Sequence, residues 1–541
     1  MRITKISISN HQRVVDLDVD VRDHAVLVGP NAVGKSTVLR LLDGLLGASW
    51  GQLVGSLDPT QLRDASEKMV VELQLRGLDA DDIAHFADKV EVGTGAEEGA
   101  VWLTMRLVAA VSPIDPERLD IERSFVKPLV EDAAVSRDDL RQIGWAFLPA
   151  SRSPDRDLGT GRTSAVRSLL RAVSLDATEA KAIEDALAEL STALKVSPSL
   201  ATLRHELAKE LSALFPEPID KDEIAVDLPS STIDEPLNDV DVQLDRGGAK
   251  APLSAQSDGL RSLAVVAVQL LARRSARILA IDEPEIHLHP RAQANLAALL
   301  ASAPGQRLVA THAPSVLARF APAHAVAVTT SGVRQLAAAS FAGDPKRFQH
   351  WWVDSALEPL TADRIVFVEG ISDRILVHAI ARLLGHELDH RGVSVVALNG
   401  AGNFRPAIRL FGPAGFGIRL LGMVDENEAP IPADALGVAV ADLPNHDVLT
   451  SYADLEEEYA TAMGVVDTVA LLTQSGLFTE AGIKAATSAA TIAAISASDL
   501  AEHVLRKNKV EAAAALSDGM TAAQATTLAT VTDLVQRAVA P

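Results

Sequence analysis

The chain has 541 residues, which is too long for one hydrophobic core, so we expect about two to four domains. Its formal net charge of -22 argues against a protein that coats nucleic acid through bulk positive charge, although a local basic channel is compatible with that sum. The absence of cysteine excludes disulfides and thiolate metal sites.

The first residues, Met1 to Ile8, alternate like a β-strand and lack the apolar core of a signal peptide. The longest apolar run, around Leu263 to Ala272, is too short to cross a bilayer. We therefore predict a soluble, cytoplasmic protein that does not enter a membrane.

The apolar strand at residues 25–28 leads directly into a phosphate-binding loop at residues 29–37, and a helix is expected to follow. Glycines let backbone N–H groups turn towards phosphate oxygens, Lys35 can reach the β- and γ-phosphates, and the Ser36 hydroxyl can coordinate Mg²⁺. The loop predicts an ATP site, and its candidate residues are Gly29, Asn31, Gly34, Lys35, Ser36 and Thr37.

Strand-like and loop-like patterns alternate up to about residue 150, for example at residues 69–75 and 101–107. The pattern is helical over 163–214, and Ser197-Pro198 divides it into two helices that suggest a hairpin. We interpret this segment as a structural insert of the kind that often serves for dimerisation.

A second apolar strand, residues 278–281, ends in two acids. Asp282 can hold Mg²⁺ through water, and Glu283 is placed to polarise the attacking water. A further strand ends at His312, for which we favour a contact with the γ-phosphate.

Between these elements, Ser257-Asp258-Gly259 opens a helix with a hydroxyl and free N–H groups. The order of phosphate loop, Ser-x-Gly helix start, acidic strand and histidine loop resembles the ABC-type ATPases of DNA repair and chromosome maintenance. The resemblance implies that Ser257 and Gly259 complete the ATP site of another subunit, in a head-to-tail pair. No set of hydrophobic spans accompanies these motifs, so we expect no transport function.

The segment Pro149-Ala150-Ser151-Arg152 resembles a Pro-Ala-x-Arg segment common in OLD ("overcoming lysogenization defect") ATPases. Two interpretations of Arg152 stay open: it senses phosphate, or it pairs with a carboxylate.

Three more strands follow, and acids stand at the ends of two of them. Glu369 follows the first strand, Asp373 begins the next helix, and Asp425 ends the third strand. Because parallel strands bring their carboxyl ends to one edge, we expect these acids to converge there. Clustered carboxylate oxygens suit Mg²⁺ or Mn²⁺.

This order resembles a Toprim domain, the fold of topoisomerases, primases and OLD nucleases, over about residues 360–460. Asp454-Leu455-Glu456 is similar to an Asp-Leu-Glu segment of OLD proteins. One departure is Asn427, which stands where the usual Asp-x-Asp has its second acid; Glu428 is the candidate to take over that role. The resemblance implies the metal ligands Glu369, Asp373, Asp425, Asn427 and Glu456, with Glu369 and Asp425 also catalytic.

OLD nucleases also use a late lysine for the charge that develops on the scissile phosphate. Lys509 is our choice over Lys507 for this role; the other interpretation is a basic patch on a solvated helix.

The chain thus resembles an OLD-family protein: an α/β chain with an ABC-type ATPase head, a helical insert and a C-terminal, Rossmann-like Toprim domain. We predict the first part of the head at 1–155, the insert at 156–217, the second part of the head at 218–345 and the Toprim domain with its helical tail at 355–541. The chain is also similar to the ATPase–nuclease subunit of Gabija anti-phage systems, for which a helicase is a typical partner.

The resemblance implies an ATP-dependent, Mg²⁺- or Mn²⁺-dependent endonuclease that nicks or cuts DNA, in phage defence or DNA processing, as a homodimer or higher oligomer. The main alternative is an ATPase sensor whose Toprim domain binds metal, DNA or a partner without cutting. A recombination mediator that only loads on DNA is a third interpretation, and the acidic cluster counts against it.

Overall fold

The structure is a computed structural model, and it describes residues 1–127, 132–152, 157–158, 164–171, 173, 176–214, 220, 222, 242–246, 249–273, 276–329, 332–336 and 357–540. Contacts divide the chain into two units. The first unit comprises Met1–Phe147, Arg277–Glu283 and Gln293–Pro541, and the second comprises Leu148–Ala276 and Pro284–Ala292. Within the described residues, no helix combines the length and apolar character that a membrane crossing needs.

An antiparallel sheet forms one layer of the N-terminal head, in the order β2-β1-β4-β6-β7-β8 with β5 paired to β6. The side chains of β4 alternate between buried and half-buried, as expected for a sheet with one face on a core. Its strands are β1 (Arg2–Ser9), β2 (Leu17–Asp20), β4 (Met69–Arg76), β5 (Glu91–Val92), β6 (Val101–Val111), β7 (Leu119–Phe125) and β8 (Ala133–Ala134).

A second, mostly parallel sheet has the order β15-β14-β3-β13-β12-β9. Strands β12, β13 and β14 are buried along their whole length, which fits the apolar residues that make up most of each strand. The strands are β3 (His24–Val28), β9 (Trp145–Leu148), β12 (Ile278–Asp282), β13 (Gln306–Ala310), β14 (Ala325–Thr329) and β15 (Gly332–Gln335).

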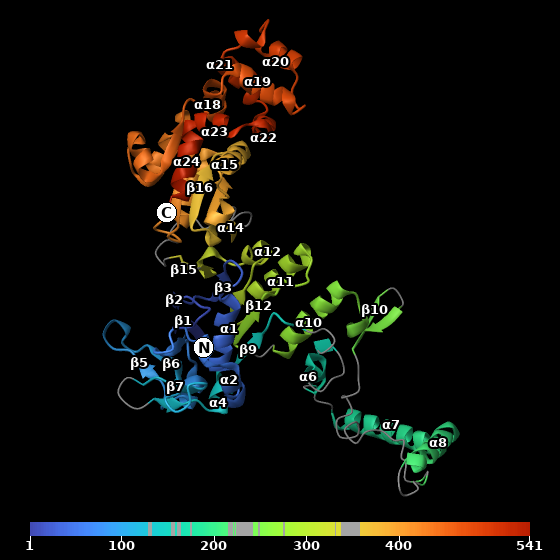
Figure 1. Cartoon of the computed structure of the whole chain (residues 1–541). Coiled ribbons are helices and arrows are strands. Elements are labelled where there is room, and N and C mark those ends of the chain that lie inside the picture. Colours follow the sequence, from blue (N-terminus) through green and yellow to red (C-terminus); the bar gives the residue numbers. More distant parts are fainter. Residues whose placement is uncertain are drawn as a thin grey trace. The chain divides into compact units, whose positions relative to one another are not determined.

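Helix α1 (Lys35–Leu46) joins the two sheets into one core. It contacts β12 and β13 of the parallel sheet and β4 and β6 of the antiparallel sheet (Figure 1). The start of this helix is therefore fixed from both sides. The remaining helices of the head are α2 (Trp50–Ser56), α3 (Ala80–His85), α4 (Arg137–Ile143), α11 (Pro290–Ser302) and α12 (Pro314–Leu317).

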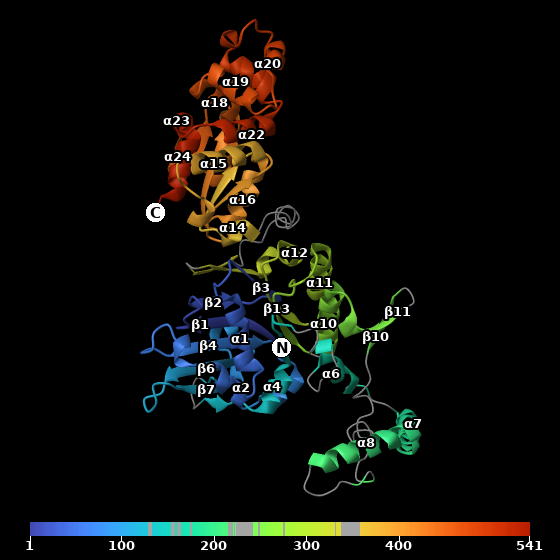
Figure 2. The ribbon, with the colours of Figure 1, turned by 45° about the vertical axis from the view of Figure 1, so that its right-hand side comes forward.

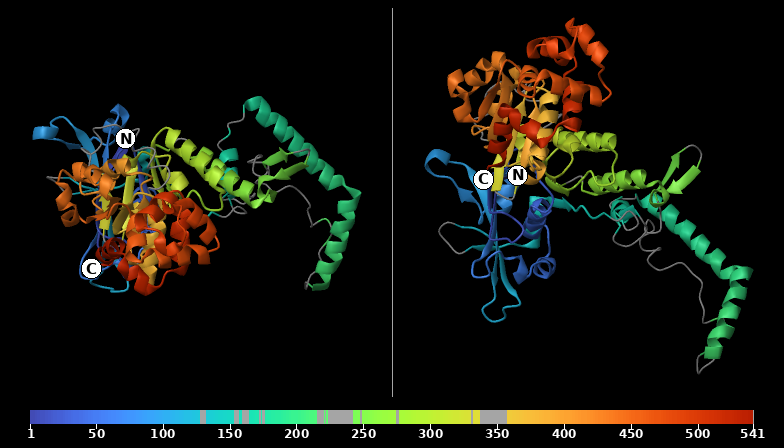
Figure 3. Two further views of the ribbon diagram at one scale, coloured as in Figure 1. Left: turned by 90° about the horizontal axis from the view of Figure 1, so that it is seen from above. Right: turned by 45° about the horizontal axis from the view of Figure 1, so that its top comes forward.

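The second unit contains the predicted helical insert. Helices α7 (Ala177–Val196) and α8 (Pro198–Leu214) meet at Ser197, so the predicted break is confirmed. Figure 3 shows an open elbow rather than the closed hairpin that we expected, and none of the described side chains of α7 is buried. The unit also holds α6 (Ala165–Arg171), β10 (Gln243–Arg246), β11 (Ala249–Pro252) and α10 (Asp258–Ala272), with α6 packed on α10.

A third sheet, wholly parallel, follows in the order β17-β16-β18-β19. The three strands predicted in this half of the chain are confirmed. They are β16 (Arg364–Val368), β17 (Val393–Ala397) and β18 (Arg419–Asp425), with β19 (Val448–Ser451) at the edge. Residues 337–356, around the predicted boundary between the head and the Toprim domain, lie outside the described part of the chain.

The alanine-rich tail is helical, as predicted, and it belongs to the same core as this sheet. Figure 2 shows α22 (Lys509–Gly519) and α24 (Ala529–Val539) against α15 (Ile371–Leu383), and contacts confirm both pairs. The other helices are α14 (Leu357–Thr361), α16 (Phe404–Phe411), α17 (Pro430–Leu436), α18 (Leu455–Ala462), α19 (Val465–Gln474), α20 (Glu480–Thr487), α21 (Ala497–Leu500) and α23 (Ala522–Thr527).

Two histidines stack edge to face at the end of the head's parallel sheet. The rings of His24 and His324 lie 5.1 Å apart between centroids, and the Arg307 backbone N–H donates to His24 Nδ1. Burial lowers the pKa of His324 to about 4; the charges of His24 and Arg22 act in the same direction, and Asp23 opposes them.

This pair predicts a pH-dependent stability. The pKa of His324 is about 4 in the folded chain against 6.5 in a free side chain, so the unfolded chain takes up the proton first. The stability that neutral His324 provides is complete above pH 6.5 and is lost as the pH falls towards 4. In urea unfolding, His324→Gln should lose less free energy of unfolding than the wild type over this window. The exposed control His446→Gln should follow the wild type, and equal slopes for all three would contradict the prediction.

Candidate functional site

The phosphate loop connects the end of β3 to the start of α1, as the sequence predicts. Lys35 is 4% exposed, and its Nζ donates to the carbonyl oxygens of Gly29 (2.9 Å) and Pro30 (2.8 Å). The cation is therefore held inside the loop, where phosphate oxygens would replace these carbonyls. Asn31 is exposed at the tip of the loop.

The loop glycines occupy positions that a larger residue cannot take. Gly34 has a φ of 96°, and a Cβ added there would lie 2.3 Å from the carbonyl oxygen of Arg13. A Cβ at Gly29 would lie 2.0 Å from the Val328 carbonyl oxygen. The backbone path of the loop therefore depends on glycine at both positions.

The acidic strand lies beside this loop. Ser36 Oγ donates to Asp282 Oδ1 at 2.8 Å, and Asp282 is fully buried at the end of β12. Glu283 follows with a φ of 44°, and its Oε1 lies 3.6 Å from Nε2 of His312. The fold thus brings together the side chains that the sequence assigned to magnesium, to the attacking water and to the γ-phosphate.

A cavity of about 560 Å³ adjoins the same helix, and the sequence analysis missed it. Thr37 and Arg40 of α1 line one side, and the turn at His11 to Arg13 lines another. Asp58 to Gln61 contribute as well. These segments carry no shared motif, so only the folded chain reveals the cavity.

The Ser-x-Gly element belongs to the second unit. Ser257 caps the N-terminus of α10, and a Cβ at Gly259 would meet open space. In the same unit, Arg152 lines a small cavity with Ser262 and His287. The roles of Ser257, Gly259 and Arg152 stay predictions.

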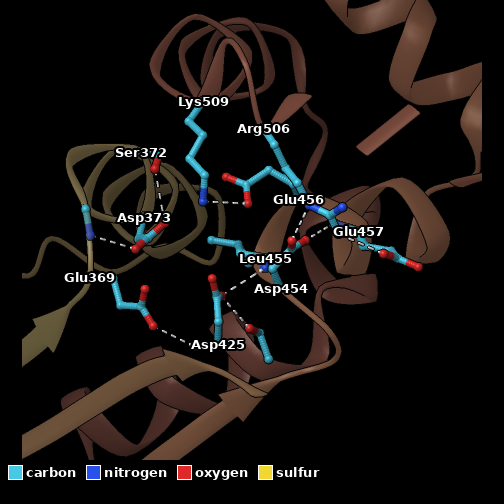
Figure 4. Close-up of polar contacts among 12 residues, drawn as sticks. Glu369, Ser372, Asp373, Asp425, Asp454, Leu455, Glu456, Glu457, Arg506 and Lys509 are labelled. Atoms are coloured by element: carbon cyan, nitrogen blue, oxygen red, sulfur yellow. Dashed lines mark hydrogen bonds and ion pairs between the residues drawn. The ribbon is translucent and has the colours of Figure 1, made fainter. Parts of the chain in front are cut away.

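A second group of functional side chains gathers at the carboxyl edge of the third sheet (Figure 4). Glu369 follows β16, and its Oε1 accepts from the backbone N–H of Asp425 at 2.7 Å. Asp425 Oδ1 accepts in turn from Ser451 Oγ (3.0 Å) and from the backbone N–H of Leu455 (3.3 Å). The parallel register therefore places the first two predicted acids side by side.

Asp373 comes from the first turn of α15. Its Oδ2 accepts from the backbone N–H of Gly370 at 2.9 Å, and its Oδ1 from Ser372 Oγ at 3.2 Å. These bonds also cap the helix, so the side chain combines a structural role with its place in the cluster.

Lys509 begins α22 and reaches the cluster from the tail. Its Nζ lies 2.9 Å from Oε2 of Glu456, a residue that is 2% exposed. Arg506 pairs with Asp454 and with Glu457 (Figure 4). Lys507, the alternative in the sequence analysis, is exposed.

Burial and like charges shape the acidity of this cluster. Burial raises the pKa of Glu369 to about 8, and the charges of Asp425, Glu428 and Asp373 add to the shift. Burial also raises the pKa of Asp373, Asp425 and Glu456. For Lys509, burial acts against protonation, but the neighbouring carboxylates outweigh it and raise its pKa.

Half-buried carboxylates with raised pKa values gain free energy from a cation. Within the described residues, no three histidine, aspartate or glutamate side chains already stand in metal-binding geometry. A divalent ion would have to draw these carboxylates together. Asn427 is exposed on the turn after β18, whereas Glu428 is half-buried.

The sequence analysis missed Ser451, Arg506 and Tyr459, which contact or face the acidic residues. Serine, arginine and tyrosine are common everywhere, so no local pattern distinguishes these three.

Two family models match the chain. Residues 108–318 match an AAA domain model named for the AbiEii toxin of a Type IV TA system, a match that begins after the phosphate loop. Residues 360–426 match the Toprim domain of overcoming lysogenization defect protein-like proteins. The chain thus resembles OLD-family ATPase–Toprim proteins.

Relatives of this family align with most of the chain. An OLD nuclease of Thermus scotoductus is 24% identical over 420 residues, or 74% of this chain and 77% of the relative. The Old nuclease of Escherichia phage P2 is 20% identical over 466 residues, or 79% of this chain and 77% of the relative. Among solved structures, the C-terminal region of the Burkholderia pseudomallei OLD protein has a TM-score of 0.28 and 24% identity, covering 33% of this chain and 99% of that region.

The loop geometry predicts the effect of one methyl group. Gly34→Ala places a Cβ against the Arg13 carbonyl and forces a left-handed backbone on alanine, at a cost of about 1–3 kcal/mol for the backbone alone. Binding of a fluorescent ATP analogue should weaken by at least about tenfold. The control Gly55→Ala, in α2 with open space around it, should bind as the wild type does. Unchanged binding by Gly34→Ala would refute this account of the loop.

Proposed function

We propose that this protein is an ATP-regulated, metal-dependent DNA endonuclease. The observation that carries the proposal is the meeting of Glu369, Asp425 and a lysine-paired Glu456 at the carboxyl edge of a parallel Toprim sheet. The relatives that align with most of its length are named as nucleases, which supports the same chemistry.

The candidate ligands for Mg²⁺ or Mn²⁺ are the carboxylates of Glu369, Asp373, Asp425 and Glu456; the Asp-x-Asp motif by itself also points to position 427, where Asn427 is exposed. When bound, such ions would activate water and stabilise the negative charge that builds up on the phosphate oxygens as the phosphorus is attacked. The backbone N–H of Asp425 orients Glu369, and the Ser451 hydroxyl orients Asp425. Lys509 is the nearby cation, and it can shift from Glu456 towards a phosphate that enters the site.

The head would bind ATP with Mg²⁺ through Lys35, Ser36 and Asp282, with Glu283 as general base and His312 at the γ-phosphate. The cavity beside α1 has the volume for a nucleoside, and Asp58 and Gln61 offer hydrogen-bonding groups there. Ser257 and Gly259 of a second subunit would complete the site. ATP binding would then pair the heads and bias access to the Toprim site.

A homodimer or larger homo-oligomer that acts on DNA, in phage defence or DNA processing, fits this scheme, with a helicase as a candidate partner. Nicking and double-strand cutting are both within its chemistry. The exposed Asn427 favours a second candidate, an ATPase sensor whose Toprim domain does not cut.

Cleavage of supercoiled plasmid separates the two functions. With Mg²⁺ or Mn²⁺ the wild type should convert plasmid to nicked or linear form, and Glu369→Ala should reduce the rate below detection because it removes the central carboxylate. Lys35→Ala should change the response to ATP while the metal-dependent reaction persists. The exposed control Glu480→Ala should cut as the wild type does. No cutting with either ion in any nucleotide state would sink the nuclease proposal, and cutting that survives Glu369→Ala would place the active site elsewhere.

The two late lysines give a matched comparison. Lys509→Met should slow cleavage by at least about 100-fold, since it removes the cation beside the acidic cluster. Lys507→Met removes an equal charge from an exposed position two residues away and should cut within about twofold of the wild type. Single-turnover rates, with thermal unfolding as a folding check, measure both. Equal losses in the two variants would assign the effect to general DNA attraction instead.

A further inference from the structure

The turn after β18 sends three consecutive side chains to different places. Glu426 Oε2 accepts from the backbone N–H of Ala453 at 3.2 Å, which fixes it to the loop before α18. Asn427 is exposed to solvent. Glu428 is half-buried and ends the turn that follows Asp425.

The backbone explains this distribution. The strand ends at Asp425, and residues Glu426–Glu428 form a 3₁₀ turn capped by Asp425. In a 3₁₀ turn the side chains at i and i+3 lie over one another, whereas positions i and i+2 share a face only in an extended strand. Glu428 is therefore on the side of Asp425, and Asn427 is not.

Glu428 also carries a buried oxygen that lacks a partner. Its Oε2 is out of contact with solvent and accepts no hydrogen bond from any part of the chain that the structure describes. A buried carboxylate oxygen without a donor, beside a second carboxylate, is unfavourable by itself. A bound cation would satisfy both groups.

A second buried group points to a missing component in the same cluster. Tyr459 is 1% exposed, and its hydroxyl has no hydrogen-bond partner among the described residues. Tyr459 follows Glu456 by three residues on α18, so the two side chains share one side of that helix. A buried donor on Tyr459 and a buried acceptor on Glu428 thus both lack partners among the described residues.

We propose that Glu428, and not Asn427, supplies the cation ligand that the second acid of an Asp-x-Asp motif supplies in other Toprim domains. This inference rests on the metal dependence in the proposed function. It changes the ligand set that the motif alone implies: the chain keeps the carboxylate but moves it by one residue, from the i+2 to the i+3 position after the strand.

Mn²⁺ binding to the full chain tests the assignment independently of cleavage. Titration calorimetry without nucleotide, so that the head site carries no metal–nucleotide complex, gives the affinity. Glu428→Gln keeps the size of the side chain and should weaken Mn²⁺ at least tenfold. Asn427→Ala should change the affinity by less than twofold. The double variant Asn427→Asp/Glu428→Gln should stay weak, because position 427 faces solvent.

Thermal unfolding checks that the variants still fold. Without metal, Glu428→Gln should unfold at a temperature no lower than the wild type, because it removes a negative charge beside Glu369; a lower temperature would contradict the burial argument.

Unchanged Mn²⁺ affinity in Glu428→Gln, or a tenfold loss in Asn427→Ala, would overturn the inference, as would recovery in the double variant. Mn²⁺ binding that needs Glu428 without any DNA cleavage would keep the inference and refute the nuclease. Conversely, if the protein cleaves DNA but Glu428→Gln leaves its Mn²⁺ affinity unchanged, the nuclease proposal stands and the inference about Glu428 is refuted.

Discussion

The accumulation of half-buried carboxylates at one edge of a parallel sheet is the constraint on which the C-terminal half depends. Strands β16, β18 and β19 run in one direction, so the residues that end them meet at the same edge. Glu369 and Asp425 are brought together in this way, against their mutual repulsion. The folded chain offsets that repulsion with the Asp425 backbone N–H, the Ser451 hydroxyl and the Lys509 cation. These contacts compensate the cluster only in part, because burial first, and then the charges of Asp425, Glu428 and Asp373, still raise the pKa of Glu369.

The helical tail carries Lys509, whose Nζ lies beside Glu456 of the acidic cluster. Helix α22 packs on α15, which itself carries Asp373 in its first turn. The core of the sheet continues through these helices without interruption. Lys509 is thus positioned by the same apolar contacts that stabilise the domain, and the precision of the site follows from the packing of the tail.

The head applies the same rule to a different chemistry. Gly29 follows β3, Asp282 ends β12 and His312 follows β13. Three neighbouring parallel strands therefore bring the residues predicted to bind nucleotide to one edge of the sheet. Helix α1 lies between the two sheets and holds the phosphate loop at that edge. Both halves of the chain therefore place candidate site residues at the carboxyl ends of parallel strands.

The sequence by itself determined the phosphate loop, the acidic strand ends and the buried strands of both parallel sheets. These features depend on neighbouring residues: an apolar run that ends in Gly-x-x-x-x-Gly-Lys-Ser, or in an acid, specifies its own local structure and its edge of the sheet. Tertiary structure decided the open elbow at Ser197, the cavity beside α1, the contact of Lys509 rather than Lys507 with Glu456, and the burial of Glu428 rather than Asn427. Each of these depends on the packing of segments far apart in the chain, or on whether the backbone after β18 stays extended or turns. The local pattern of residue types is the same for either outcome, so only the folded chain distinguishes them.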